Sequence, residues 1–181
     1  MASYAFTGRG AALPYQDPGS TMVLHREIDV ADIVANNPGK LALAASPQTA
    51  LSSFTGFVQN DILEVFEVPA GTAILMMGVR VQTQEGAACL IDVGCVSATQ
   101  TMLNVAATSA DPDSFGDALD LNTAANTQIP GQTVEVTDMN GIAGRALDCY
   151  VTDGSIDLTV MSSGGMGTAK FDIFFHVAKV F

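Results

Sequence analysis

The stretch from Asp61 to Thr83, DILEVFEVPAGTAILMMGVRVQT, constrains the fold of this chain more than any other. It contains two apolar runs, residues 62–68 and 72–83, separated by Pro69-Ala70-Gly71. Proline cannot donate to a sheet ladder and glycine accepts a positive φ angle, so this tripeptide predicts a break between two strands. Apolar residues of one parity mark a buried face in the second run: Leu75, Met77, Val79 and Val81. The stretch therefore predicts an all-β domain.

Other segments show the same alternation or end at turn residues. Residues 87–96 and 133–138 are predicted strands, and residues 170–181 form the most regular one. In that last strand one face is apolar and carries Phe171, Ile173, Phe175, Val177 and Phe181. Near the N-terminus, Val23 and Leu24 begin a short predicted strand. Asp29 is predicted to cap a short helical turn with Ile33 and Val34 on its apolar side.

The dipeptide Asp153-Gly154 predicts a β-hairpin with a two-residue type I′ turn. A loop of that length fixes the register, so Tyr150 would face Asp157. The apolar pairs then fall on the opposite face: Val151 with Ile156, Cys149 with Leu158 and Leu147 with Val160. Turn chemistry and hydrophobic parity agree on this hairpin.

Short strands separated by turns, with few helical segments, predict an all-β protein: a jelly-roll-like β-sandwich with an extended N-terminal arm. The simplest division of the 181 residues is an arm, residues 1–20, and a single β-sandwich domain, residues 21–181. That length is enough to bury a sizeable core.

Composition excludes several classes of function. The formal net charge is -12 and the basic residues do not cluster, so binding to nucleic acid is not expected. No apolar run approaches the roughly 18 residues that span a bilayer, and the N-terminus lacks the pattern of a signal peptide. The three cysteines, Cys89, Cys95 and Cys149, are predicted to be reduced core thiols. From these features we expect a protein that is made in the cytosol. The sequence predicts no cofactor, and no Cys or His spacing fits a zinc site.

The arm combines Gly, Pro, Ala and Ser with scattered aromatic residues. One interpretation is a frayed terminus. The other is an arm that docks on a partner, because aromatic side chains suit an interface better than a solvated tail. On the second interpretation the candidate contacts follow the arm into the domain: Tyr4, Phe6, Tyr15, His25 and Arg26.

Residues 109–121, SADPDSFGDALDL, are predicted to form an acidic loop. Asp111, Asp113 and Asp117 are weak candidates for a metal site. An EF-hand is excluded, because Phe115 occupies its third ligand position and Asn122 stands where a bidentate Glu is needed. An irregular calcium site remains one alternative, and a solvated turn anchored by Phe115 is the other.

Motifs for catalysis are missing from the sequence. Neither histidine, His25 or His176, lies near a nucleophile motif, and the spacing of Gly164-Gly165-Met166-Gly167 fits no phosphate-binding loop. An enzyme is therefore not expected. The absence of tryptophan disfavours a carbohydrate-binding module or a glycosidase without excluding either.

The ordered set of motifs REIDVADI (26–33), DILEVFEVPAGTAI (61–74), VRVQT (79–83), LIDVGCV (90–96) and DPDSFGDALDL (111–121) resembles a group of tailed-bacteriophage virion proteins, the small jelly-roll decoration or cement proteins of the capsid. The likeness covers residues 20–181. It departs from the family pattern at Cys95, where the family has an aspartate, and in residues 41–57.

The resemblance implies a virion protein on the capsid exterior, made in the host cytoplasm. It would be a homotrimer that binds the major capsid protein and bridges neighbouring subunits. Two alternatives remain open: the base of a phage head fibre or tail spike, and a carbohydrate-binding β-sandwich that uses calcium through the acidic loop.

Overall fold

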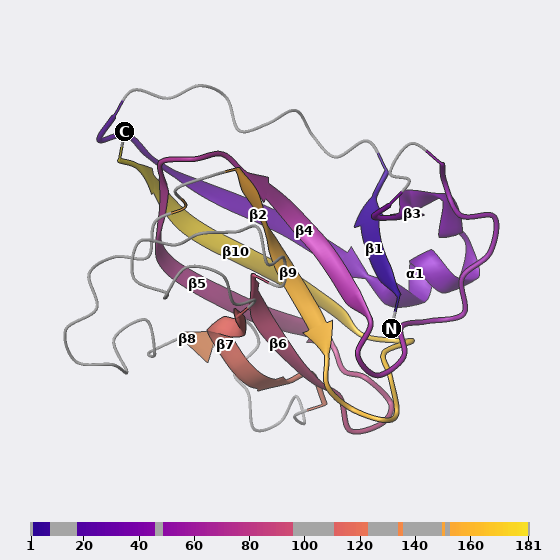
Figure 1. The fold of residues 1–181 in the computed structure, drawn as a ribbon. Coiled ribbons are helices and arrows are strands. Elements are labelled where there is room, and N and C mark those ends of the chain that lie inside the picture. The colour runs from indigo at the N-terminus through magenta and orange to yellow at the C-terminus, as the bar shows by residue number, and fades with distance from the viewer. Residues whose placement is uncertain are drawn as a thin grey trace.

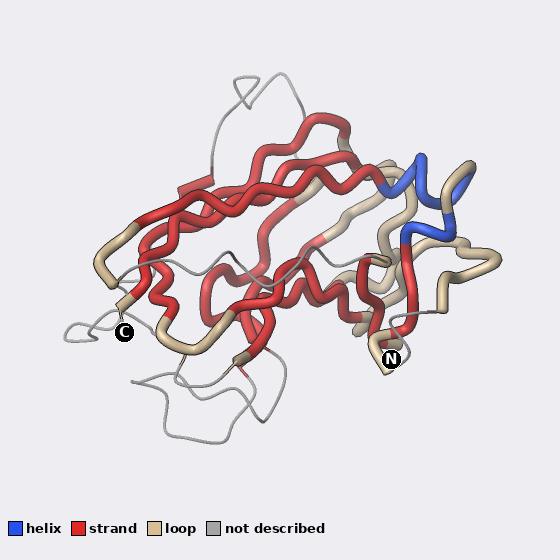
Figure 2. The backbone as a smooth tube through the Cα atoms, turned by 90° about the horizontal axis from the view of Figure 1, so that it is seen from above, coloured by secondary structure: helices blue, strands red, loops and turns tan. Residues whose placement is uncertain are grey.

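The computed structural model describes residues 2–7, 18–45, 49–95, 111–122, 134–135, 150 and 153–180. This part of the chain folds as two packed β-sheets with one short α-helix at one end, as Figures 1 and 2 show. The strands are β1 (Ser3–Phe6), β2 (Thr21–Asp29), β3 (Leu41–Leu43), β4 (Ile62–Val68), β5 (Thr72–Thr83), β6 (Leu90–Cys95), β7 (Asp111–Asp120), β8 (Val134–Glu135), β9 (Gly154–Val160) and β10 (Lys170–Lys179).

The strand order confirms the predicted all-β sandwich. One sheet, here called sheet A, has the order β3-β1-β4-β9-β6-β7, and the other, sheet B, has the order β2-β10-β5-β8. Apart from β1 and β3, each sheet alternates strands from the early and late parts of the chain, and each of these neighbours pairs antiparallel.

The central stretch forms both of its predicted strands. Residues 62–68 are β4 and residues 72–83 are β5, and Gly71 has a φ of 78°. The two strands belong to different sheets, so Pro69-Ala70-Gly71 carries the chain from sheet A to sheet B. Asp153 holds this connection, because its Oδ1 accepts a hydrogen bond of 2.9 Å from the Ala70 amide.

The predicted helical turn is also confirmed. Helix α1 (Val30–Ala35) begins after Asp29, whose Oδ1 accepts from the Asp32 amide at 2.9 Å. Ile33 is buried and Val34 is half-buried. A 3₁₀ turn, η1 (Pro38–Lys40), follows and leads into β3. No helix in the described part of the chain is long and apolar enough to cross a membrane.

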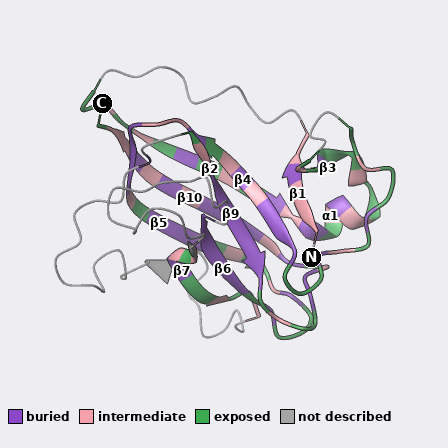
Figure 3. Ribbon diagram, viewed as in Figure 1, coloured by how far each residue is buried: buried purple, intermediate pink, exposed green. Residues whose placement is uncertain are grey.

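The core lies between the two sheets, and buried residues line their inner faces (Figure 3). The predicted apolar face of the last strand is buried from Phe171 to Val177, which confirms that strand; Phe181 lies outside the described residues. Fully buried side chains come from both sheets and include Leu63, Ile74, Met77, Ile91, Phe115, Ile156, Leu158, Phe171 and Phe175. Cys89 and Cys95 are buried free thiols, as predicted, and Cys149 is not described.

The acidic loop was a wrong prediction. Residues 111–120 are β7, an edge strand of sheet A that pairs antiparallel with β6. The pairing is interrupted by register shifts, and Ala118 has a positive φ of 48°. Phe115 is buried, as its role of apolar anchor required. Aspartate, proline and glycine disfavour strands intrinsically, but pairing with β6 and burial of Phe115 outweigh that preference here.

The register of the predicted hairpin was also wrong. β9 lies inside sheet A between β4 and β6, and Asp157 is paired with Glu64 on one side and Gly94 on the other. No edge is left at Asp157 for Tyr150. The Tyr150 backbone instead bonds Gly71 and Thr72, and its hydroxyl donates to the Ser155 carbonyl at 2.9 Å. Residues 147–149 and 151–152 of the hairpin lie outside the described residues.

Candidate interaction surface

Tyr4 lies within the sandwich of its own chain. β1 is inserted between β3 and β4 in sheet A, and the Tyr4 ring packs edge-on against Phe54 and Phe57, with both centroid distances at 5.4 Å. Burial first, and then the negative charge of Asp61, raise the pKa of the Tyr4 hydroxyl. The Asp61 carboxylate also accepts from the Ala2 amide at 2.7 Å, which fixes the start of β1. The first part of the predicted arm is thus a strand of sheet A.

Phe6 and Arg26 contact each other. The Arg26 guanidinium lies 4.4 Å from the Phe6 ring centroid and 5.5 Å from that of Phe66 on β4. Such cation–π contacts contribute about 0.5–2 kcal/mol each, depending on exposure. Phe6 and Arg26, both predicted interface residues, therefore contact each other between the two sheets. Their contact links β1 of sheet A to β2 of sheet B. Tyr15 lies outside the described residues.

His25 points to the opposite side of β2, on the outer face of sheet B. Its Nε2 lies 2.9 Å from Asp172 Oδ1, and the Gln82 amide donates to Asp172 Oδ2 at 2.7 Å. Burial works to raise the pKa of Asp172, but the hydrogen bonds from His25 and Gln82, together with the charges of His25 and Arg80, hold it below the ordinary value. This network fixes the side chains of three adjacent strands on one face.

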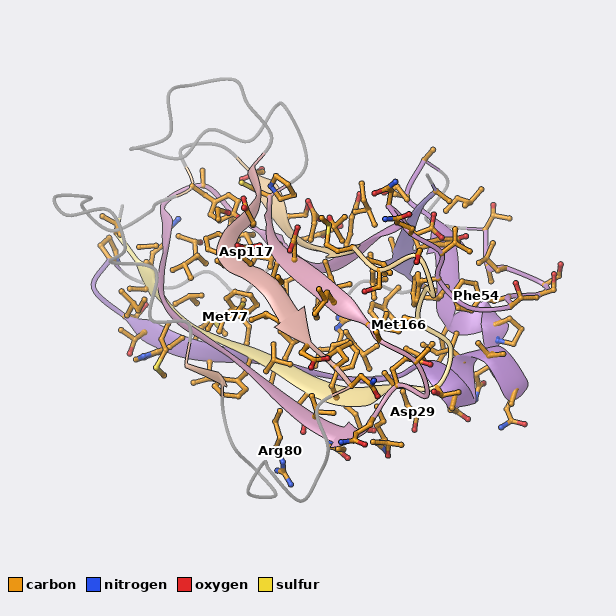
Figure 4. The ribbon with its side chains drawn as sticks, turned by 90° about the horizontal axis from the view of Figure 1, so that it is seen from below. Asp29, Phe54, Met77, Arg80, Asp117 and Met166 are labelled. Carbon is orange, nitrogen blue, oxygen red and sulfur yellow. The ribbon has the colours of Figure 1, made fainter. Side chains whose placement is uncertain are left out.

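The outer face of sheet B combines apolar and imidazole side chains. We define it by the residues of β2, β10 and β5 that alternate with the core: Val23, His25, Met76, Arg80, Phe174 and His176. Val23 is 61% exposed and Met76 is 42% exposed. In the register, His176 stands opposite both of them, so the three form one row across the sheet. In Figure 4, Arg80 points away from the sandwich, whereas Met77 points into it.

Charge divides between the two sheets. The strands of sheet A carry eight acidic residues and no Lys, Arg or His: Glu64, Glu67, Asp92, Asp111, Asp113, Asp117, Asp120 and Asp157. The described strands of sheet B carry four acidic residues (Glu27, Asp29, Glu135 and Asp172) and four Lys or Arg (Arg26, Arg80, Lys170 and Lys179). Both histidines are also on sheet B. The excess negative charge of the strands is therefore confined to one layer, and a protein that meets this molecule encounters two different faces.

The candidate metal residues stand on β7. Asp113 and Asp117 are exposed, and nothing is described of the Asp111 side chain. Burial, and then the charges of Asp117 and Asp113, raise the pKa of Asp92 on the neighbouring strand, while a hydrogen bond from the Ala118 amide at 2.9 Å opposes them. Among the residues that the structure describes, no three His, Cys, Asp or Glu side chains are grouped so that they could hold a metal ion.

Sequence analysis missed the outer face of sheet B. The prediction covered only the start of β2 and named His25 and Arg26 as contacts that continue the arm, without placing His25 on a face shared by three strands. The signal was present: Thr21, Val23, His25, Glu27 and Asp29 share one parity over the nine residues of β2. A count of charge by strand would also have separated the acidic layer from the neutral one.

Two chains from solved phage capsids are similar to this chain. A chain in the capsid of Ralstonia phage GP4 is similar over 98% of this chain and 98% of its own length, with 13% identity and a TM-score of 0.57. A chain in the cyanophage Pam1 capsid asymmetric unit is 11% identical over 94% of this chain and 93% of its own, with a TM-score of 0.41. No protein-family model matches the sequence, and no curated protein does. The first likeness shows a shared fold.

Proposed function

We propose that this chain is a structural protein of a phage virion, a decoration or cement protein on the outside of the head. The observation that carries the proposal is the extent of the likeness to the GP4 capsid chain. It covers 98% of both chains, so it applies to the whole architecture and not to a common module within it. The motif order of residues 20–181 supports the same class independently.

In this role the chain would perform no chemistry. It would bind the major capsid protein and bridge neighbouring subunits, and many copies would together oppose the pressure of packaged DNA. Repeated attachment makes modest individual contacts effective, because each further contact on the same shell is intramolecular. The acidic sheet A suits the side that faces solvent, since like charge keeps particles dispersed.

The proposed assembly is a homotrimer on the capsid exterior, formed from chains made in the host cytoplasm. The arm remains the proposed contact with the shell or with a neighbouring copy. Tyr15, which lies outside the described residues, stays among the proposed contacts of the arm. Tyr4, Phe6 and Arg26 already contact other residues of this chain.

Binding to heads tests this function. The purified chain is titrated onto expanded, DNA-free heads of the phage that encodes it and sedimented with them, and unexpanded heads serve as the control. We expect saturable binding to expanded heads with a fixed number of copies per head. No binding to expanded heads would overturn the proposal. A thermal shift with calcium or simple sugars would instead favour the carbohydrate-binding alternative.

A further inference from the structure

We infer that the outer face of sheet B is the surface on which this chain contacts a second copy of itself. The inference rests on the homotrimer of the proposed function and deepens it by naming the surface of contact, and a failure to self-associate would leave the head-binding test unaffected. It assigns the contact to β2, β10 and β5 of the folded domain, and not to the N-terminal arm.

Charge selects this face for contact between identical copies. Two copies that met through sheet A would bring its exposed acidic residues against those of the other chain, with no Lys, Arg or His on those strands to compensate: Glu67, Asp113, Asp117 and Asp120. Like charges opposed across an interface cost several kcal/mol. On the outer face of sheet B, Arg80 and Lys170 stand in the register beside acidic residues of the same face, Glu27, Asp29 and Asp172, so charges of both signs are present and two copies can meet there at a lower electrostatic cost.

The side chains of this face suit burial. Val23, His176 and Met76 form one row across the three strands, and His25 and Phe174 form part of the next. Val23 and Met76 are among the large apolar side chains that remain exposed in the described part of the chain. Beyond the apolar rows lies a polar end where Lys170 Nζ is 3.2 Å from Glu27 Oε1 and 3.3 Å from Asp29 Oδ2. Apolar side chains beside a charged margin are common in protein interfaces.

The size of the face predicts a weak association. Three strands about 4.8 Å apart, each at least nine residues long at about 3.3 Å per residue, give a face of about 14 Å by 30 Å. Two copies would then cover on the order of 800 Å² in total, which is below the range of stable complexes. We therefore expect concentration-dependent assembly in the micromolar range.

Two matched double variants test the inference. Val23→Glu with Met76→Glu places like charges on the outer face of sheet B, where the two residues are 61% and 42% exposed. Val58→Glu with Met161→Glu is the control. Those residues are 60% and 40% exposed and lie near each other at the loop end of the sandwich, where Gln59 Nε2 donates to the Met161 carbonyl at 2.8 Å. The two pairs add equal charge at almost equal exposure.

Sedimentation equilibrium of the full chain, from about 1 to 200 μM, measures the assembly. We expect the wild type to associate, the sheet B pair to raise the dissociation constant at least about 100-fold and the control pair to change it less than about threefold. A monomeric wild type over this range, or equal effects of the two pairs, would overturn the inference. Circular dichroism verifies folding. If the sheet B pair does not fold, the exposed Arg80→Glu variant is measured in its place. We expect this variant to raise the dissociation constant at least about tenfold. An unchanged dissociation constant would overturn the inference.

Discussion

Glu85 provides a quantitative test of how the loop at one end of the sandwich is held. This residue follows β5 and is only 8% exposed. Its Oε2 accepts from the amides of Gly167, Thr168 and Ala169 at 2.9, 2.8 and 2.9 Å, and its Oε1 accepts from the Thr168 hydroxyl at 2.7 Å. One carboxylate thus satisfies three consecutive backbone donors just before β10.

Substitution Glu85→Gln removes the charge and replaces one acceptor oxygen with a donor. A hydrogen bond to a charged group contributes about 1.5–3 kcal/mol, and the four bonds are not additive because water can replace those at exposed Thr168. We expect the free energy of unfolding at pH 7 to fall by about 3 kcal/mol, and the melting temperature to fall by about 6–12 °C for a domain of this size.

The pH dependence separates this mechanism from a general loss of packing. Burial works to raise the pKa of Glu85, but the hydrogen bonds from Thr168, Gly167 and Ala169 hold it below the ordinary value. A lowered pKa stabilises the folded state above the ordinary pKa of about 4.3, and this stability is lost as pH falls through the folded pKa.

The difference in the free energy of unfolding between wild type and Glu85→Gln should therefore be largest at pH 7 and should shrink below about pH 4. Urea titrations at a series of pH values measure it, with the exposed Asp113→Asn variant as the control, for which a change below about 0.5 kcal/mol is expected. A difference of the same size at pH 3 and pH 7 would refute the carboxylate clamp.

Three further predictions concern stability and reactivity. Gly165→Ala should lower the free energy of unfolding by more than about 2 kcal/mol, because Gly165 has a φ of 71° and a Cβ there would lie 2.3 Å from the Phe57 carbonyl oxygen. A urea midpoint equal to that of the wild type would contradict this prediction. Tyr4→Ala should cost about 3 kcal/mol through loss of the aromatic cluster, whereas Tyr4→Phe should cost less than about 1 kcal/mol; equal effects would refute the packing role. Cys89 should resist alkylation in the native state at pH 8, because burial, and then the charges of Glu85 and Asp120, raise the pKa of its thiol to about 11. Peptide mapping after iodoacetamide treatment checks it, and rapid labelling at Cys89 would be the contrary result.

The features predicted correctly from sequence are those set by neighbouring residues. The bounds of β4 and β5 follow from Pro69-Ala70-Gly71, and the start of α1 follows from the side chain of Asp29. The alternation from Phe171 to Val177 likewise fixed the buried face of β10. Local turn chemistry, capping and parity act over a few residues, so they can be read without knowing the fold.

The features missed depend on partners far away in sequence. β1 is a strand because β4 supplies its parallel partner, with Tyr4 opposite Leu63. β7 is a strand because β6 pairs with it, although its composition is typical of a loop. The hairpin register failed for the same reason, since β4 and β6 occupy both sides of β9 at Asp157. The face of sheet B could be recognised only after the strands were ordered.

A three-dimensional reconstruction of the phage head at a resolution that separates strands tests the head-surface role most directly. We predict density for this two-layered sandwich on the outer surface of the shell, over the joints between neighbouring major capsid subunits. Its absence from the shell, or its presence only at the base of a fibre or a tail spike, would contradict a decoration role.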